Sequence, residues 1–398
     1  PVRSNRVVRL TIFGPDHSPH LKNFISNYNK KVISLGYKLH LQVFSSNPYK
    51  FQSIFNLNYM LYDYFFYKIN FFNINEKTWF RNIYLYARGV FSNKINFKIG
   101  KKINNFSPDF IWVHELQSSG YMYLKVKPYI KEKFKKNVFG SVWGNDIFYY
   151  QDIKAHRLKI FDLLRNFKLL HVESSRDYVL ANQLGYSGVK LPVSSITLNE
   201  FVNLKVNRNK FIKKEFFLII KGGYYLRSFN KLFINNIECN LEFWKGKKIF
   251  IYNPSDWDIF SYSKLRDKFN LDIKISEQSL RHEFLLEMFR KSKYHISFNL
   301  SDGIPNTFLE TLFCNSISFI PNSAGISSDL PKDIYSKIVF DIFNDDYTAM
   351  IKNIDLNSNY NELLKKLLKY VTENSINPKR FDDVAKISIK LAKQNFEK

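Results

Sequence analysis

Short runs of apolar and β-branched residues recur along the first half of the chain, and segments of helical periodicity separate them. The first run, residues 6–13 (RVVRLTIF), ends at Gly14-Pro15. A helix is expected to follow, with Ser18 as its N-cap and Pro19 as its first residue. Further strands are expected at residues 39–44, 110–113, 138–142 and 169–172. Strands that alternate with helices indicate a parallel, doubly wound α/β sheet.

A second series of the same kind follows a polar, basic stretch at residues 191–214. Its expected strands are residues 216–220, 248–252, 271–275, 295–300 and 318–320, the last of which closes the series. We therefore divide the chain into an N-terminal Rossmann-like domain at residues 1–200 and a C-terminal one at residues 201–376. Residues 377–398 are expected to form an amphipathic helix, able to cross back to the N-terminal domain, because their apolar residues recur at helical spacing.

The chain is strongly basic, since 60 Lys and Arg residues against 35 acids give a formal charge of +25. That excess must face water or an anionic partner: nucleic acid, an anionic membrane surface or a phosphorylated substrate. Aromatic residues make up 17% of the chain; their codons are largely AT-rich, so we attribute part of this bias to the genome. The two cysteines, Cys239 and Cys314, are too few for a disulfide framework or a zinc cluster, which favours a reducing cytoplasm.

The most informative segment is residues 298–312, FNLSDGIPNTFLETL, in which an apolar strand leads into a polar loop and then a helix. In an open α/β sheet such a loop lies at the carboxyl end of the strands, where ligands bind. Gly303 permits a tight turn, and the N–H groups near Asn306 and Thr307 are the unpaired donors of a helix N-terminus. Such a terminus binds phosphate through these donors and its dipole.

Two carboxylates, Asp302 and Glu310, lie on either side of this helix start and are separated by seven residues. Both can face one ligand, so that one accepts hydrogen bonds from sugar hydroxyls and the other from a ribose diol. Local structural roles are open as well. Thr307 and Glu310 have the spacing of a capping box, and Asp302 before Gly303 is typical of an ordinary turn.

Four short motifs resemble those of family-4 glycosyltransferases of the GT-B architecture, and they follow one another along the chain in the order that the family has them. Residues 301–310 (SDGIPNTFLE) resemble the S-D-G-x-P-N-x-x-x-E form of their acidic motif. Residues 142–147 (VWGNDI) resemble a turn of their N-terminal domain, and residues 172–186 resemble its next strand and helix. The stretch at residues 221–227, KGGYYLR, resembles the basic segment that opens their nucleotide-binding domain.

The resemblance implies two Rossmann-like doubly wound domains that face each other across a cleft. It implies transfer of a hexosyl group, with retention of anomeric configuration, from a nucleotide sugar to a glycan or lipid-linked glycan, as in bacterial surface polysaccharide biosynthesis. Backbone contacts from Ser276 and Glu277 to the base are implied too. No metal and no cofactor beyond the donor are expected.

Positive charge must stabilise the departing diphosphate in an enzyme that uses no metal. Arg227 and Lys221 are the first candidates, because they follow a strand and flank Gly222 and its neighbouring glycine. Lys231 lies one helical turn beyond Arg227 and is the third. The alternative is that some of these are ordinary surface cations.

Polar residues that follow the N-terminal strands are candidates for binding the acceptor and the transferred sugar. His114 and Glu115 follow the strand at residues 110–113, and the resemblance implies that this position contacts the transferred sugar. Asp146 is a candidate for orienting the acceptor, or else a helix N-cap. The loop after the first strand adds Gly14, His17 and His20 to these candidates. The two histidines are expected either to contact the acceptor or a phosphate, or to be ordinary surface residues.

Residues 121–137 carry six Lys against one Glu, interleaved with Tyr and Phe, and residues 91–102 add four more Lys. A cationic surface with aromatic anchors suits an anionic membrane and would bring the enzyme to a lipid-linked acceptor. A solvated face is the alternative. No apolar run is long enough to span a membrane and no signal peptide is visible, so we expect a cytoplasmic protein, peripheral on the inner face of the membrane.

Two other classes of function are open. A GT-B-fold sugar-nucleotide epimerase would share the donor site but would turn over the nucleotide sugar without an acceptor. A nucleic-acid-binding protein would explain the charge. The sequence has no zinc spacing, no RNP-type aromatic motif and no helix-turn-helix signature, so nucleic acid is not an expected partner.

Overall fold

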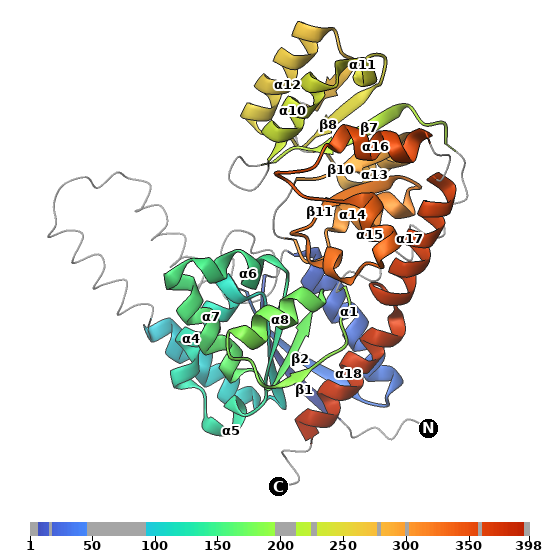
Figure 1. Cartoon of the computed structure of the whole chain (residues 1–398). Helices are drawn as coiled ribbons and strands as arrows, with labels where there is room; N and C mark the ends of the chain where they lie inside the picture. The colour runs from blue at the N-terminus through green and yellow to red at the C-terminus, as the bar shows by residue number, and fades with distance from the viewer. Residues whose placement is uncertain are drawn as a thin grey trace, which may run out of the picture.

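The computed structural model describes residues 7–15, 18–45, 93–195, 212–223, 229–276, 280–298, 302–356 and 360–393. Within these ranges the chain forms two six-stranded parallel sheets with helices on both faces. In Figure 1 the N-terminal sheet lies in the lower half of the molecule and the C-terminal sheet in the upper half. The prediction of two Rossmann-like, doubly wound domains is confirmed.

The N-terminal sheet has the strand order β2-β1-β3-β4-β5-β6. All residues of β3, β4 and β5 are buried because helices cover both faces, which explains why these strands are continuous apolar runs. The bounds are β1 (Val7–Gly14), β2 (Lys38–Ser45), β3 (Phe110–His114), β4 (Val138–Val142), β5 (Leu169–Val172) and β6 (Val189–Lys190). The first five match the predicted strands to within one residue at each end, whereas the exposed β6 has no apolar run that would predict it.

Successive side chains of β3 point to opposite faces of this sheet, where they meet two different layers of helices. On one face Trp112 packs against Phe24 of α1 (Pro19–Ser34), with ring centroids 4.7 Å apart. On the other face Ile111 packs in a separate core with Tyr123 and Leu163. This second layer contains residues 93–106, α4 (Tyr121–Val126), α5 (Glu132–Lys135), α7 (Lys154–Asn166) and α8 (Ser175–Gln183), with the short α6 (Asn145–Phe148) before α7.

The C-terminal sheet has the strand order β12-β11-β10-β7-β8-β9. From β7 the strands that follow in sequence are added on one side, as β8 and β9, and then on the other side, as β10, β11 and β12. The strand order therefore reverses between β7 and β10, which are neighbours although two strands separate them in sequence. The bounds are β7 (Phe216–Lys221), β8 (Ile249–Tyr252), β9 (Ile273–Ile275), β10 (Ser292–Ile296), β11 (Ile317–Pro321) and β12 (Val339–Phe340). The prediction that a strand near residues 318–320 closes the series was wrong, because the two-residue β12 follows it.

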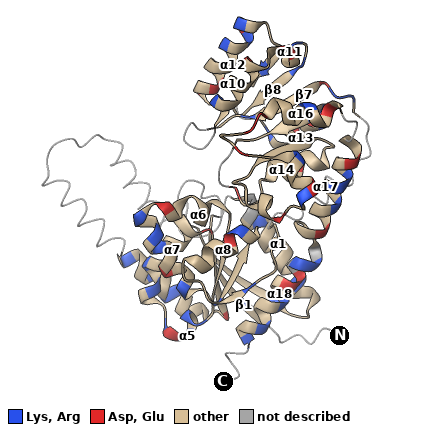
Figure 2. Cartoon of the chain, in the orientation of Figure 1, with Lys and Arg blue, Asp and Glu red and all other residues tan. Residues whose placement is uncertain are grey.

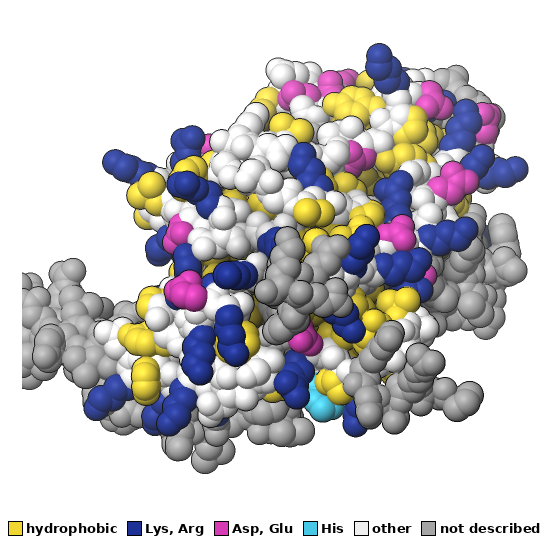
Figure 3. Space-filling model, turned by 90° about the horizontal axis from the view of Figure 1, so that it is seen from below, with side chains coloured by type: hydrophobic (Ala, Val, Ile, Leu, Met, Phe, Trp, Pro, Cys, Tyr) yellow, Lys and Arg dark blue, Asp and Glu magenta, His cyan; other side chains and the backbone are white. Residues whose placement is uncertain are grey.

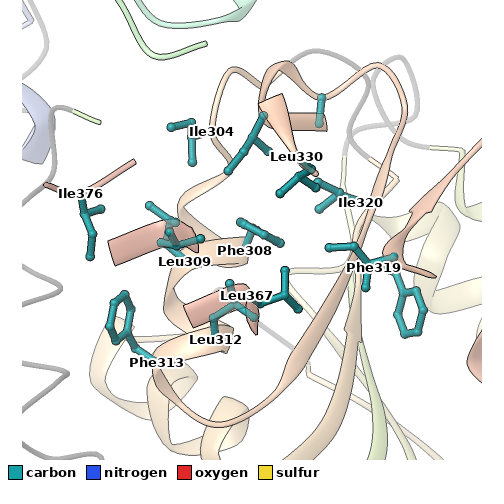
Figure 4. Close-up of a cluster of buried hydrophobic side chains, with 14 of the residues drawn as sticks. Ile304, Phe308, Leu309, Leu312, Phe313, Phe319, Ile320, Leu330, Leu367 and Ile376 are labelled. Carbon is teal, nitrogen blue, oxygen red and sulfur yellow. The ribbon is translucent and has the colours of Figure 1, made fainter. Parts of the chain in front are cut away.

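Apolar side chains fix the helices of the second domain on its sheet. Figure 4 shows Phe308 and Leu312 of α14 beside Leu367 of α17 and Phe319 of β11, all in one buried cluster. This packing holds the start of α14 at the carboxyl edge of the sheet. The helices are α10 (Asn230–Cys239), α11 (Leu241–Trp244), α12 (Asp256–Phe269), α13 (His282–Lys291), α14 (Asn306–Phe313), α15 (Lys332–Ile338), α16 (Tyr347–Leu356) and α17 (Tyr360–Asn374).

The last helix, α18 (Pro378–Lys393), packs on α1 of the first domain, where Figure 1 shows the red helix beside the blue one. The hydroxyls of Tyr28 and Ser388 are hydrogen-bonded at 2.8 Å in the buried interface. Lys31 and Asp382 form an ion pair at 2.8 Å. The chain end therefore ties the second domain to the first. Among the residues described in these ranges, no helix is both long and apolar enough to cross a membrane.

Three fully buried histidines make stability depend on pH. Burial lowers the pKa of His171 to about 4 and of His295 to about 3, and lowers that of His114 as well. Histidine in the unfolded chain titrates near 6.5. The unfolded chain therefore binds more protons below this pH, and stability should fall as pH drops from about 6.5 towards 4, by ~1.4 kcal/mol per pH unit for each histidine.

Urea unfolding at neutral pH and at about pH 5 measures this loss. His171→Gln removes one of the titrating groups and should make the loss smaller by ~2 kcal/mol. His40→Gln, which replaces an exposed histidine of β2, is the matched control. An equal loss of stability in the wild type and in both variants would contradict the expectation.

Candidate active site at the domain junction

The carboxyl edges of the two sheets meet at a pair of glycines. Gly144 follows β4 and Gly303 follows β10, and a β-carbon at Gly144 would lie 2.6 Å from the Cα of Gly303. Gly144 also has a φ of +73°, which glycine adopts without the strain that other residues incur. The two loops therefore pack backbone against backbone. This contact brings together the edges at which open α/β sheets bind ligands.

Backbone hydrogen bonds fix the loop before α14 against a 3-10 turn, η4 (Gly325–Asp329). The N–H of Gly325 donates to the carbonyl of Asp302 at 2.9 Å, and the N–H of Ile326 donates to that of Gly303 at 2.8 Å. Because these bonds use backbone atoms, they set the path of the loop without using the Asp302 carboxylate. The predicted turn residues thus lie at the junction with the first domain.

Helix α14 begins at Asn306 with Pro305 as its N-cap, and no side chain caps it. The capping box considered for Thr307 and Glu310 is therefore not formed. Thr307 is the second residue of the helix, so it stands inside the first turn rather than at the capping position. A helix that starts without a side-chain cap leaves its first N–H groups to other partners, and an anion is a favourable one.

Glu310, in the second turn of α14, is nearly buried, at 6% exposed. Its Oε1 is hydrogen-bonded at 2.7 Å to Nε2 of His282, the first residue of α13. The His282 side chain is 54% exposed, so the pair reaches from the protein interior to its surface. His282 therefore orients the carboxylate that the sequence singles out. It lies 28 positions away and no local pattern marks it.

A buried chain of hydrogen bonds supports the strand ends under this helix. The Tyr252 hydroxyl is bonded to Nε2 of His295 at 3.1 Å, and Nδ1 of His295 is bonded to the Ser318 hydroxyl at 2.7 Å. Burial, followed by the negative charge of Glu310, raises the pKa of Tyr252, which therefore stays neutral. This series of hydrogen bonds joins β8, β10 and β11 and fixes these strands relative to one another at the carboxyl edge of the sheet.

The segment after β7 is fixed by a buried aspartate. A β-carbon at Gly222 would lie 2.6 Å from the Cα of Pro254, so only glycine lets these two loops approach. Asp258 accepts from the N–H of Gly223 at 3.1 Å and from Nδ2 of Asn230 at 2.8 Å. Asp258 thereby fastens both ends of the connection between β7 and α10.

The structure describes some of the other residues that were predicted to bind the donor. Lys221 is half-buried at the carboxyl end of β7, beside β10, and Ser276 is 8% exposed just after β9. Lys231 is exposed on α10. Arg227 and Glu277 lie outside the described residues. In the part of the chain that the structure describes, no three His, Cys, Asp or Glu side chains cluster to hold a metal ion.

His114 ends β3 with its ring fully buried. Neither ring nitrogen has a hydrogen-bond partner among the described residues. The ring stacks on Trp112 with centroids 5.6 Å apart and meets Phe24 edge-on at 4.2 Å. Burial lowers its pKa well below the usual value, so the ring is neutral at pH 7. An unpaired buried polar group costs free energy, and a hydroxyl of a ligand would remove that cost.

The carboxylates of Glu115 and Asp146 accept hydrogen bonds from backbone N–H groups. Glu115, with a φ of +69°, accepts from the N–H of Ser118 at 2.9 Å. Asp146 is 3% exposed, accepts from the N–H of Trp143 at 3.0 Å and of Leu116 at 3.2 Å, and does not cap α6. Burial, then the charge of Glu115, raises the pKa of Asp146. These bonds shape the loops after β3 and β4, so the N-cap considered for Asp146 is corrected to a loop-fixing role.

The loop after β1 is described in part. Gly14 is buried, and a β-carbon there would lie 2.7 Å from a methyl group of Leu21, so the glycine lets α1 approach the strand. His17 lies outside the described residues. His20 lies in the first turn of α1, and only its backbone place is described.

A second contact between the domains joins α8 to η4 and to the segment before it. The N–H of Ser175 donates to Oδ2 of Asp329 at 3.1 Å, and its hydroxyl donates to Oδ1. Arg176 donates to the carbonyl of Ser323 and lies over the ring of Phe148, 4.3 Å from its centroid. These partners lie 154 and 147 positions apart, so sequence reasoning missed them.

Two doubly wound domains that meet at the carboxyl edges of their sheets have the GT-B architecture. Solved structures of similar shape support this assignment. The sucrose-phosphate synthase of Thermosynechococcus elongatus has a TM-score of 0.60 at 9% identity, over 99% of this chain and 100% of that chain. An α,α-trehalose-phosphate synthase (UDP-forming) of Burkholderia xenovorans, in complex with glucose-6-phosphate, has a TM-score of 0.59 at 11% identity, over 97% and 100%.

A structure described as trehalose-6-phosphate from E. coli bound with UDP-2-fluoro glucose has a TM-score of 0.55 at 12% identity, over 97% of this chain and 99% of that chain. At such identities these similarities establish the fold, and this chain has a two-domain, Rossmann-like GT-B fold. No protein-family model and no curated protein sequence matches the chain.

Proposed function

We propose that this protein is a glycosyltransferase that takes a hexosyl group from a nucleotide sugar and transfers it, with retention, to an acceptor. One observation carries the proposal: the strand order reverses between β7 and β10, and two glycine-containing loops leave the sheet there. These loops begin after Lys221, the last residue of β7, and after Ile296, the last residue of β10. Open α/β sheets bind nucleotides at such a switch point. Neighbours of the same fold add support, since one is bound with UDP-2-fluoro glucose and another is UDP-forming.

Different parts of the donor would be held by different groups. The diphosphate would lie against the first N–H groups of α14 and the ammonium of Lys221, with Arg227 as a second cation, so no metal ion would be needed. Glu310 would accept from the ribose hydroxyls. Asp302 and the neutral His114 would bind hydroxyls of the transferred sugar. The transition state would be oxocarbenium-like, and no side chain is assigned as a covalent nucleophile.

Two classes of acceptor have support. The resemblance of residues 301–310 to the family-4 motif favours a glycan or lipid-linked glycan at the inner face of the cytoplasmic membrane. The neighbour in complex with glucose-6-phosphate favours a sugar phosphate as the second candidate. Both would approach from the N-terminal domain, whose carboxyl edge faces the proposed donor site.

A transfer assay tests this function. The purified chain is incubated with UDP-, GDP- and ADP-sugars, each with a sugar phosphate or a polyprenyl-linked acceptor, with and without EDTA. We expect one donor to release its nucleoside diphosphate with an acceptor present, unaffected by EDTA, and to give an α-linked product from an α-linked donor. Turnover of the nucleotide sugar without acceptor would instead indicate an epimerase, and no turnover of any donor would contradict the proposal.

A further inference from the structure

The outward side of α7 carries a narrow stripe of two apolar residues between two cations. Lys154, Leu158, Phe161 and Arg165 follow one another at intervals of three or four residues, so they share one face of the helix. Leu158 is 66% exposed and Phe161 is 40% exposed. The core of the domain is served by a different face of α7, whose Ile160, Leu163 and Leu164 are fully buried. Leu158 lies mostly in solvent, and the Phe161 ring rests on Gly185 with 40% of its surface exposed. Neither residue belongs to the buried core of the domain.

The surroundings of this stripe are cationic. Arg157 is exposed beside it, and the Arg165 guanidinium lies 5.2 Å from the centroid of the Phe161 ring. The acid next to the stripe, Asp162, is paired with Lys127 of the adjacent segment at 3.8 Å. The stripe thus consists of apolar groups with positive charges on either side. The negative charge of the neighbouring Asp162 is balanced by Lys127.

The rest of the same helical layer extends the positive surface. Figure 2 shows several blue Lys and Arg positions on the ribbons around α5 and α7, and Figure 3 shows dark blue cations beside yellow apolar groups on the underside. The exposed cations of this layer are Lys94, Lys98, Lys101, Lys102, Lys125, Lys131, Lys133 and Lys136.

Two of the four aromatic residues within 121–137, which were expected as membrane anchors, are not on this surface, whereas Tyr121 and Tyr129 are half-buried. Tyr123 and Phe134 are buried in the core of the domain, at 0% and 3% exposed. The sequence-based assignment of these residues as membrane anchors was therefore wrong. Tyr123 and Phe134 alternate with lysines because the segment is helical and amphipathic, with these two rings directed inward.

We propose that the outer face of α7 docks on an anionic lipid surface, with Leu158 and Phe161 inserted at the headgroup level and the surrounding cations against lipid phosphates. An amphipathic helix framed by Lys and Arg is the pattern of interfacial binding. The phosphates of a nucleic acid would pair with the cations but would leave Leu158 facing charge. The N-terminal end of α7 lies at the carboxyl edge of the sheet, just after α6, so docking would bring the lipid surface near the acceptor side. This last point rests on the proposed function.

Binding to vesicles tests the docking without any need for enzyme activity. The full chain is sedimented with vesicles of equal parts phosphatidylglycerol and phosphatidylcholine, and with phosphatidylcholine alone. The variant Leu158→Gln/Phe161→Gln should bind the anionic vesicles about tenfold more weakly than the wild type. The control Ile259→Gln/Phe260→Gln removes apolar groups that are 36% and 68% exposed on α12 of the other domain, and it should bind normally.

A second pair of variants tests the charges. Lys154→Gln/Arg157→Gln/Arg165→Gln should lose most anionic-vesicle binding, whereas the equal loss of charge in Lys264→Gln/Lys268→Gln/Lys274→Gln should not. Unchanged binding of the Leu158→Gln/Phe161→Gln variant would overturn the proposal. Equal losses in the α7 variants and in the control variants of the second domain would overturn it too. Retained binding to duplex DNA by a protein that ignores vesicles would assign the surface to nucleic acid instead. None of these outcomes changes the result expected in the transfer assay. The proposed membrane docking can therefore be refuted without refuting the proposed glycosyl transfer, and the reverse.

Discussion

Glu310→Ala is expected to lower kcat/KM for the nucleotide-sugar donor by about 100-fold while the chain remains folded. The carboxylate is held by His282 at the start of α13, at 2.7 Å, and is assigned to the ribose diol of the donor. Loss of a hydrogen bond to a charged group costs about 3 kcal/mol at most, which corresponds to about two powers of ten in rate. His282 is 54% exposed and remains solvated when its partner is removed, so the substitution leaves no buried unpaired charge.

The matched control is Glu287→Ala on the neighbouring helix α13. Glu287 is likewise paired with a cation, Lys291 at 2.7 Å, but its side chain is 46% exposed. Its removal should leave donor kinetics unchanged. His282→Ala should raise KM for the donor several-fold and change kcat little, because it loosens the carboxylate without removing it. Wild-type kinetics in Glu310→Ala would remove this residue from the site.

Gly144→Ala is expected to reduce transfer by about 100-fold or more, because it would force the two domains apart where their backbones pack against each other. The new β-carbon would lie 2.6 Å from the Cα of Gly303, and the backbone of Gly144 has a φ of +73°. Displacing the loop before α14 by about 1 Å is enough for an effect of this size. Binding of the nucleoside diphosphate alone, which needs mainly the second domain, should weaken much less.

Gly246→Ala separates the two causes of the Gly144 effect. Gly246 has a φ of +72°, yet nothing lies within 4 Å of the place its β-carbon would take. This control incurs only the backbone strain, about 1 kcal/mol of stability, and should keep normal transfer. If Gly144→Ala and Gly246→Ala had the same kinetics, the contact between the two glycine loops would have no part in activity.

The fold could be predicted from the chain because each sheet is parallel and buried. Buried strands require continuous apolar runs, and runs such as residues 138–142 and 169–172 became β4 and β5 without any change of bounds. The strands that escaped prediction, β6 and β12, are two residues long. Such short strands follow from the sheet beside them rather than from their own sequence.

The candidate site could be predicted only where its residues lie close together in one short segment of the sequence. Gly303, Asn306 and Glu310 belong to a single strand-loop-helix unit, and the structure places that unit at the domain junction. Contacts between distant segments carry no local signal, as His282 with Glu310 and Ser175 with Asp329 show. Charge patterns also mislead when burial is unknown, which is why the rings of Tyr123 and Phe134 were assigned to the surface.

Hydrogen exchange in the presence of a nucleoside diphosphate tests the central claim most directly. UDP, GDP and ADP are first compared by thermal shift, because a ligand that binds only the folded chain raises its stability. Amide exchange is then followed with the one that stabilises. Protection should appear at residues 302–309 and at Gly222 and Gly223, where the loops leave β10 and β7. Stabilisation by the nucleotide with protection confined to other parts of the chain would contradict a donor site at this edge of the second sheet.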